Sequence, residues 1–351
     1  MSSWLVSLLV LSGLIFFHEL GHFFAARLMG VYVEVFSIGF GKRLFTFRKW
    51  DTEWSISAVP LGGYVRMKGQ DDADPTKKSF DADSYNSKTP IQKIFILLAG
   101  PFANFLLAYI LYFFIALGGP NILSPVIGTV VDDSPAFIAG MESNDTIRSI
   151  NGTQITTWSE MADIISTSKG SLSLEIERNG FIELKKLTPK LRESTNMFGE
   201  TVQKKMIGIS SAGVTHKLDL SITDTLSYAT EQTIFASTMI FTGIKKLLIG
   251  EVPAKELGGV ISIVKITSDA TDAGWMSVLF FAALISVNLG VLNLLPIPAL
   301  DGGHIMFNLY ELIFRREASE AIIIKLTIAG WVILFGLMGL GLFNDINRLM
   351  G

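Results

Sequence analysis

The chain has 351 residues, of which 49% are hydrophobic and 17% are charged, and its mean hydropathy is +0.45. This composition excludes an ordinary soluble domain and is typical of a polytopic membrane protein. The formal net charge of −3 and the absence of a dense basic stretch argue against a nucleic-acid partner. Because the sequence contains no cysteine, disulfides and thiolate metal ligands are excluded, so histidines and carboxylates must hold any metal.

Four apolar stretches are long enough to cross a hydrocarbon core of about 30 Å. The first is not a cleavable signal peptide, because no basic residue precedes it and it is too long for the apolar part of one. The fourth is short for a span. The four stretches are Trp4–Met29, Ile94–Leu117, Trp275–Leu295 and Leu326–Phe343.

The placement of Lys and Arg predicts the orientation of these spans. No basic residue precedes Arg27, whereas the loop after the first span is rich in Lys and Arg, and the loop before the fourth contains Arg315 and Arg316. Short basic loops stay in the cytoplasm. We therefore expect both termini, and the long segment 118–274, to lie outside the cytoplasm.

The first span contains His18-Glu19-Leu20-Gly21-His22. In a helix, His18 and His22 lie one turn apart on one face and can hold one zinc ion, and Glu19 is placed to take a proton from a bound water. The pattern is weak by itself, and two core histidines that satisfy each other are the alternative. Ionisable side chains are costly in lipid, however, so the setting favours hydrolytic chemistry within the bilayer.

Four segments between the first two spans alternate apolar and polar residues, which predicts a small membrane-associated antiparallel sheet. Its edge could accept an extended peptide as an added strand, and a cytoplasmic cap without a substrate role is the alternative. The segments are Val31–Ser37, Leu44–Lys49, Glu53–Val59 and Gly63–Met67.

The second span carries Ala99-Gly100-Pro101-Phe102-Ala103-Asn104 at what we expect to be its opening. Proline in a lipid-embedded helix needs its freed carbonyl satisfied by neighbours, and the Asn104 amide can bond to another helix. We interpret Asn104 as a packing residue and not as part of the catalytic machinery.

The composition changes to that of a soluble α+β module between Pro125 and Pro189. Strands are predicted at 125–131, 146–150, 172–178 and 181–187, with helices at 134–140 and 158–168 and turns at Asn151-Gly152 and Asn179-Gly180. Ser-Pro-Ala-Phe-Ile-Ala-Gly-Met, followed by Asp145-Thr146-Ile147, resembles a PDZ domain, although Asn144 stands where glycine is usual. Such domains bind peptide tails, and a spacer without a ligand is the alternative.

Residues 193–274 follow this module. Ile234–Leu248 is apolar, is too short to span and ends in Lys245-Lys246, so we expect an amphipathic helix at the outer leaflet. His216 is interpreted as a surface residue.

The third span leads into Asn288-Leu289-Gly290-Val291-Leu292-Asn293 and then Pro296-Ile297-Pro298-Ala299-Leu300-Asp301. A catalytic zinc needs a third protein ligand, and Asp301 is expected at the same depth as the histidines if the Pro-x-Pro pair keeps the backbone extended. Asn288 and Asn293 could bind the substrate backbone or an oxyanion, with interhelical hydrogen bonding as the alternative. His304 is left out of the ligand set because a fourth ligand would close the site.

Together, these motifs resemble the site-2 protease family, and most closely its bacterial RseP-type members. The resemblance implies intramembrane cleavage of single-pass membrane proteins, such as anti-sigma factors and remnant signal peptides, in the bacterial inner membrane. It also implies that His18, His22 and Asp301 bind Zn²⁺, with Glu19 as the base. Asn288 and Asn293, and Gly39 and Gly41 in a membrane-reentrant β-loop, are implied substrate contacts. Longer members carry two PDZ domains, whereas this chain has one such module.

The expected organisation is therefore a protease core formed by 1–117 and 275–351, a PDZ-like domain at 118–192 and a following segment at 193–274. Two other functions compete with this one. A non-catalytic adaptor would bind tails through the PDZ-like domain around a structural metal, but such a site needs no adjacent base. A metal transporter would show repeated halves with matching broken helices, and the sequence shows one broken segment.

Overall fold

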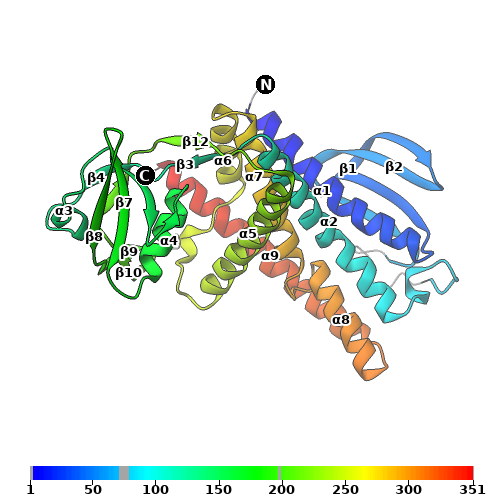
Figure 1. The fold of residues 1–351 in the computed structure, drawn as a ribbon. Helices are drawn as coiled ribbons and strands as arrows, with labels where there is room; N and C mark the ends of the chain where they lie inside the picture. The colour runs from blue at the N-terminus through cyan, green and yellow to red at the C-terminus, as the bar shows by residue number, and fades with distance from the viewer. Residues whose placement is uncertain (1–2, 71–78, 197–198, 351) are drawn as a thin grey trace. The chain divides into compact units, whose positions relative to one another are not determined.

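The computed structural model describes residues 3–70, 79–196 and 199–350 (Figure 1). The chain divides into two compact units. One is formed by Met1–Ile115 together with Asp224–Gly351, and the other by Ala116–Thr223. The metal-binding motif lies in the first unit, which we call the membrane core, and we call the second the α+β module.

Within the described residues, the membrane core contains four helices that are long and apolar enough to cross a membrane. This confirms the number and order of the predicted spans. The helix α9 is longer than the predicted stretch 326–343 at both ends. The four helices are α1 (Ser3–Leu28), α2 (Pro90–Leu117), α7 (Trp275–Asn293) and α9 (Glu320–Met350).

The predicted sheet is present as two long, bent strands beside α1, β1 (Val33–Lys49) and β2 (Thr52–Met67) (Figure 1). Residues 35–38 pair on both sides, with 63–66 and with 53–56, and residues 43–49 pair with 52–57. The four predicted segments thus lie side by side, with 63–67 at one edge. The bend in β1 falls at Gly39 and Gly41, whose φ angles of +88° and +85° favour glycine.

The inner half of this sheet packs on α1 through aromatic and aliphatic side chains. Phe36 is 1% exposed and stacks on Trp54 with ring centroids 4.5 Å apart, and Phe23 of α1 contacts both. These residues share one buried cluster with Ala26, Val33 and Met67. The packing fixes the 63–67 edge beside the helix that carries the two histidines.

Three further helices complete the membrane core. The predicted interfacial helix at 234–248 is the second half of a longer helix, α5, so that prediction was too short. Ala229 and Ala236 of α5 are buried in one cluster with Ala108, Tyr112 and Ala283, because small side chains let the helix approach α2 and α7 closely. The helices are α5 (Ile222–Leu248), α6 (Val260–Asp272) and α8 (Asp301–Phe314).

The C-terminal end of α9 holds the segment that leads into α6. The carboxylate of Asp345 accepts hydrogen bonds from the backbone N–H groups of Gly259 and Ser262, each at 3.0 Å. Asn344 donates to the carbonyl oxygens of Ala254 and Leu257 at 2.9 and 3.0 Å. Asp345 therefore caps the N-terminus of α6 in place of the glycine at its N-cap position.

The α+β module has a four-stranded antiparallel sheet of order β6-β5-β7-β8 and two short helices. All the elements predicted between 125 and 189 are confirmed to within a few residues. Asn179 and Gly180 both have positive φ and form the predicted turn between β7 and β8. The elements are β4 (Ile127–Val130), α3 (Pro135–Ile138), β5 (Thr146–Ile150), β6 (Thr153–Gln154), α4 (Trp158–Thr167), β7 (Leu172–Arg178) and β8 (Phe181–Leu187).

Five further strands described by the structure lie beyond the main sheet and belong to the same unit. β11 pairs with β4, β12 pairs with β3, and β9 pairs with β10. The domain boundary expected between residues 192 and 193 falls inside β9. The strands are β3 (Asn121–Leu123), β9 (Lys190–Thr195), β10 (Thr201–Met206), β11 (Ile209–Ser211) and β12 (Thr215–Lys217).

An ion pair with a buried carboxylate joins Asp145, just before β5, to Arg178 at the end of β7. Asp145 is 1% exposed and accepts hydrogen bonds from Nε and Nη2 of Arg178, both at 2.7 Å, and from the backbone N–H of Glu142 at 2.8 Å. Burial alone would raise the pKa of the Asp145 carboxyl, but these hydrogen bonds outweigh it and hold the pKa below its ordinary value.

Candidate metal centre

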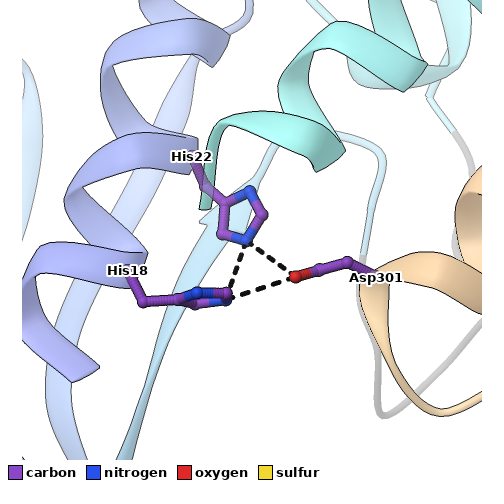
Figure 2. Close-up of side chains that lie close together, drawn as sticks. All are labelled: His18, His22 and Asp301. Carbon is purple, nitrogen blue, oxygen red and sulfur yellow. Dashed lines mark hydrogen bonds and ion pairs between the residues drawn. The ribbon is translucent and has the colours of Figure 1, made fainter. Parts of the chain in front are cut away.

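The two histidines of α1 face the interior of the membrane core. His18 and His22 are 9% and 6% exposed, and their Nε2 atoms lie 3.2 Å apart (Figure 2). They converge because residues four apart share one face of a helix. Between them, Gly21 lets α2 approach closely, since a Cβ added there would lie 2.2 Å from the carbonyl oxygen of Ala99.

Asp301, the first residue of α8, meets the two histidines from the other half of the chain. Its Oδ2 atom lies 3.2 Å from Nε2 of His18 and 3.4 Å from Nε2 of His22, as Figure 2 shows. The side chain is 17% exposed, but the Oδ2 atom is buried and accepts no hydrogen bond from the described residues. A buried carboxylate oxygen without a donor requires a compensating cation.

The turn before α8 differs from the predicted extended backbone. The N–H of Ile297 donates to Leu295 O at 2.7 Å, and the N–H of Leu300 donates to Ile297 O at 2.8 Å, so the chain turns tightly. Proline φ suits a turn as well as an extended strand. Gly302 allows α8 to start against this turn, because a Cβ there would lie 2.2 Å from Leu295 O.

The spacing of the three ligand atoms fits zinc. In a tetrahedral zinc site with bonds of about 2.0–2.2 Å, neighbouring ligand atoms lie about 3.3–3.6 Å apart. The observed separations of 3.2, 3.2 and 3.4 Å are close to these values. Two imidazoles and one carboxylate are also a donor set that zinc accepts, and three protein ligands are typical of catalytic sites.

Glu19 lies next to the inner edge of the sheet. Its side chain is partly buried, and a Cβ added at Gly63 of β2 would lie 3.1 Å from Glu19 Cγ. The edge segment 63–67 therefore begins beside the carboxylate predicted to act as the base. A Cβ at position 63 would fit only if Glu19 shifted slightly.

The two asparagines of α7 are placed differently. The Nδ2 atom of Asn293, the last residue of the helix, lies 3.5 Å from Nε2 of His18. Asn288 is five residues earlier, which places it about 7.5 Å away along the axis and about 140° around it. It is partly buried in α7, and its side chain has no hydrogen bond to the cluster within the described residues. The structure thus brings Asn293, but not Asn288, to the metal centre.

The remaining predicted residues lie outside the cluster. Gly39 is enclosed by the sheet, because a Cβ there would lie 2.8 Å from Val59 O, and Gly41 lies in the same bend. His304 is in α8 with its ring near Phe307. His216 is in β12, where its Nδ1 lies 2.7 Å from Ser124 Oγ.

Sequence reasoning missed two groups of α2 that contact the histidines. Nδ1 of His22 donates to the carbonyl oxygen of Ile96 at 2.9 Å, and Asn104 lies with Nδ2 at 3.1 Å from Nδ1 of His18. The Asn104 amide thus bonds to another helix, as expected, and its partner His18 is what sequence reasoning did not identify. Ligating histidines usually bond through their second nitrogen, so a buried amide in the adjacent span was the available signal.

Comparisons with known proteins identify the family of this chain and several of its relatives. The sequence profile of peptidase family M50 matches residues 6–337. A protein of Campylobacter jejuni named "putative zinc metalloprotease" is 47% identical over 99% of this chain and 94% of its own. Proteins of the same name from Helicobacter pylori strain J99 (41% identical; 99% and 100% covered) and Clostridium perfringens (36%; 97% and 97%) also match. A PDZ-domain structure of the SdrC-like protein from Listeria monocytogenes aligns with 24% of this chain and 84% of its own, at 20% identity and a TM-score of 0.20.

Proposed function

We propose that this chain, which belongs to peptidase family M50, cleaves single-pass membrane proteins within or near their transmembrane segments. Its family and its relatives indicate a zinc metalloprotease. One observation carries this proposal. Two histidines in a helix long and apolar enough to cross a membrane meet a carboxylate from the opposite half of the chain, with a glutamate next to them.

In this proposal, His18, His22 and Asp301 hold the metal. The distances between their ligand atoms and the types of these atoms suit a zinc ion. Zinc bound there supplies a Lewis acid and lowers the pKa of its water to about 7. Glu19 accepts a proton from the attacking water and returns it to the leaving amine, so that the peptide bond breaks without a net change in the enzyme.

Asn293 is proposed to bind the carbonyl oxygen of the scissile bond. Its amide lies 3.5 Å from a nitrogen of the cluster, and an amide N–H can donate to the negative charge that develops on that oxygen. Asn288 lies farther along α7, so its proposed contact is with the substrate backbone away from the scissile bond.

The sheet edge offers a way to present an unwound substrate. A helical peptide bond is hydrogen-bonded and shielded, so the substrate must become extended before cleavage. The segment 63–67 is an edge of the sheet and starts beside Glu19. We place the scissile segment along this edge as an added strand, with the bend at Gly39 and Gly41 as a secondary contact.

The next part of the proposal is the position and orientation of the enzyme in a membrane. The family resemblance suggests the bacterial inner membrane. Basic residues in the loops after the first and before the fourth span support an orientation with both termini and the α+β module outside the cytoplasm. The module is proposed to be a PDZ domain that receives peptide tails. Anti-sigma factors and remnant signal peptides are the proposed substrate class.

A cleavage assay in liposomes tests the proposal. The substrate is a tagged single-pass protein whose span contains helix-breaking residues, and mass spectrometry locates the cut. We expect wild-type protein to cut within the span in a chelator-sensitive way. Glu19→Gln should keep zinc and lose activity by about 10²–10⁴-fold or more, because proton transfer is removed.

Glu231→Gln is the matched control, since it makes the same chemical change at an exposed position of α5. It should cut like the wild type. Cleavage by Glu19→Gln at the wild-type rate would overturn the role of Glu19. Failure of zinc-loaded, folded wild type to cut any of several helix-destabilised spans would overturn the intramembrane substrate class.

A further inference from the structure

One stripe of α2 lies against both histidines of α1. Ile96, Gly100 and Asn104 are four residues apart and therefore share a face of the helix. The Ile96 carbonyl contacts His22, and Asn104 contacts His18. Gly100 leaves the space between them open, because a Cβ there would lie only 2.2 Å from Nε2 of His22. The two rings are thus supported by consecutive turns of one neighbouring helix.

The contact to Ile96 decides which nitrogen of His22 can bind a metal. A carbonyl oxygen can only accept a hydrogen bond, so the hydrogen of the neutral imidazole must be on Nδ1. Nε2 of His22 then carries a lone pair, and this is the atom that faces His18 and Asp301. Here the backbone alone sets the tautomer.

His18 needs the same arrangement, but its partner is a side chain that can either donate or accept. In the orientation seen, Nδ2 of Asn104 faces Nδ1 of His18 at 3.1 Å. An N–H donor at that position places the imidazole hydrogen on Nε2, which points into the cluster. This arrangement is compatible with a hydrogen bond to His22 Nε2 at 3.2 Å, but it removes the lone pair that a metal needs.

The other half of the same amide provides the solution. Asn104 is fully buried, and its Oδ1 atom has no hydrogen-bond partner among the described residues. Turning the amide by 180° exchanges Oδ1 and Nδ2, which occupy nearly the same space. Oδ1 then accepts from Nδ1–H of His18, which gives the orphaned oxygen a partner.

We propose that Asn104 is a positioning residue of the metal centre. Its side-chain carbonyl accepts a hydrogen bond from Nδ1 of His18 and so leaves Nε2 of that histidine free to bind the metal. The inference rests on the proposed ligand set of His18, His22 and Asp301.

Zinc affinity of the full-length protein, measured by competition with a chromophoric chelator, tests the role. Asn104→Leu keeps a similar volume but removes the acceptor, and it should weaken zinc binding by about 10–100-fold, the usual effect of an outer partner of a ligating histidine. Asn104→Asp offers only acceptor oxygens and should retain the wild-type affinity. A residue needed only for packing or as a donor would not be rescued by aspartate.

Wild-type affinity in Asn104→Leu, or equal weakening in both variants, would overturn the proposal. Because the leucine variant could fail to fold, a second measurement uses the wild type. In zinc-loaded protein with ¹⁵N-labelled histidine, of which the chain has four, we expect the Nδ1 of His18 to carry the hydrogen. A hydrogen on Nε2 would contradict the proposal. If Asp301→Asn lost zinc while Asn104→Leu bound zinc like the wild type, the positioning role of Asn104 would be refuted. The proposed ligand set of His18, His22 and Asp301 would still stand.

Discussion

Asp145 of the α+β module and Asp301 of the membrane core each have a buried carboxylate oxygen, but their surroundings differ. In the α+β module, Asp145 accepts three hydrogen bonds, two of them from the Arg178 guanidinium. In the membrane core, Oδ2 of Asp301 accepts no hydrogen bond from the residues that the structure describes and instead lies near two imidazole nitrogens. Removing a carboxylate from water costs several kcal/mol unless charge and hydrogen bonds compensate. The module supplies this compensation to Asp145 from its own residues, whereas the proposed zinc ion would supply it to Asp301.

This difference separates a carboxylate that stabilises a fold from one that serves chemistry. Arg178 at the end of β7 pairs with Asp145 just before the neighbouring strand β5, so Asp145 contributes wherever the module is folded. Asp301 lies at the start of a helix that is brought to the histidines only by tertiary packing. The same substitution at the two sites should therefore change different properties.

The largest effect is expected for Asp301→Asn. It removes one of three proposed ligands. Loss of a group that only hydrogen-bonds to a ligating residue typically weakens metal binding by about 10–100-fold, so the zinc affinity should fall further here. The measurement is zinc content and chelator competition on the purified protein. Asp145→Asn makes the same change and should leave zinc affinity as in the wild type. Equal zinc binding in both variants would break the comparison.

Asp145→Asn should instead destabilise the module. It removes the buried charged partner of the Arg178 guanidinium and leaves only the exposed carboxylate of Glu142, and breaking a buried ion pair costs about 3 kcal/mol. Hydrogen exchange of the backbone amides of β5 and β7 in the full-length protein would report the loss. Glu183→Gln, which removes an exposed partner of Lys185 on β8, is the control and should change exchange far less.

The contribution of the Asp145 carboxylate to the stability of the module should depend on pH. The pKa of Asp145 is lowered on folding, so its contribution is complete above the unfolded pKa of about 3.9 and is lost as the pH falls through the lower folded pKa. Exchange protection of β5 and β7 should therefore decrease between about pH 4 and lower values in the wild type. In Asp145→Asn this component should be absent. An identical acid response in the two proteins would assign the sensitivity to other groups.

The smallest effect concerns the start of α4. Thr157 Oγ1 accepts from the N–H of Glu160 at 3.0 Å, and the Glu160 carboxylate accepts from the N–H of Thr157 at 3.1 Å, which completes a capping box. Thr157→Ala should cost about 1 kcal/mol of local stability, measured as faster amide exchange in α4 alone. Thr153→Ala, in an exposed strand, is the control. Faster exchange across the whole module would show that the cap supports more than its own helix.

Local patterns in the sequence were sufficient for much of this molecule. Continuous apolar stretches predicted the four spans, because a bilayer demands a minimum length of apolar helix. Alternation and turn residues predicted the strands of the sheet beside α1 and those of the module, including the turn at Asn179-Gly180. His18 and His22 were recognisable because helical spacing places residues four apart on one face.

Tertiary structure decided what local patterns do not encode. The helix α8, the full length of α5 and the tight turn before Asp301 depend on packing that competes with local preference. Asn104 looked like a packing residue because a lone amide in an apolar helix carries no sign of its partner, and only the packing of α2 on α1 places it at His18. The sequence by itself determined which side chains could bind a metal. The fold decided which of them meet, because Asp301 lies almost three hundred residues from the histidines and only tertiary packing brings it to them. Gly21 permits the close approach of α2 to α1, and Gly302 permits the tight turn before α8.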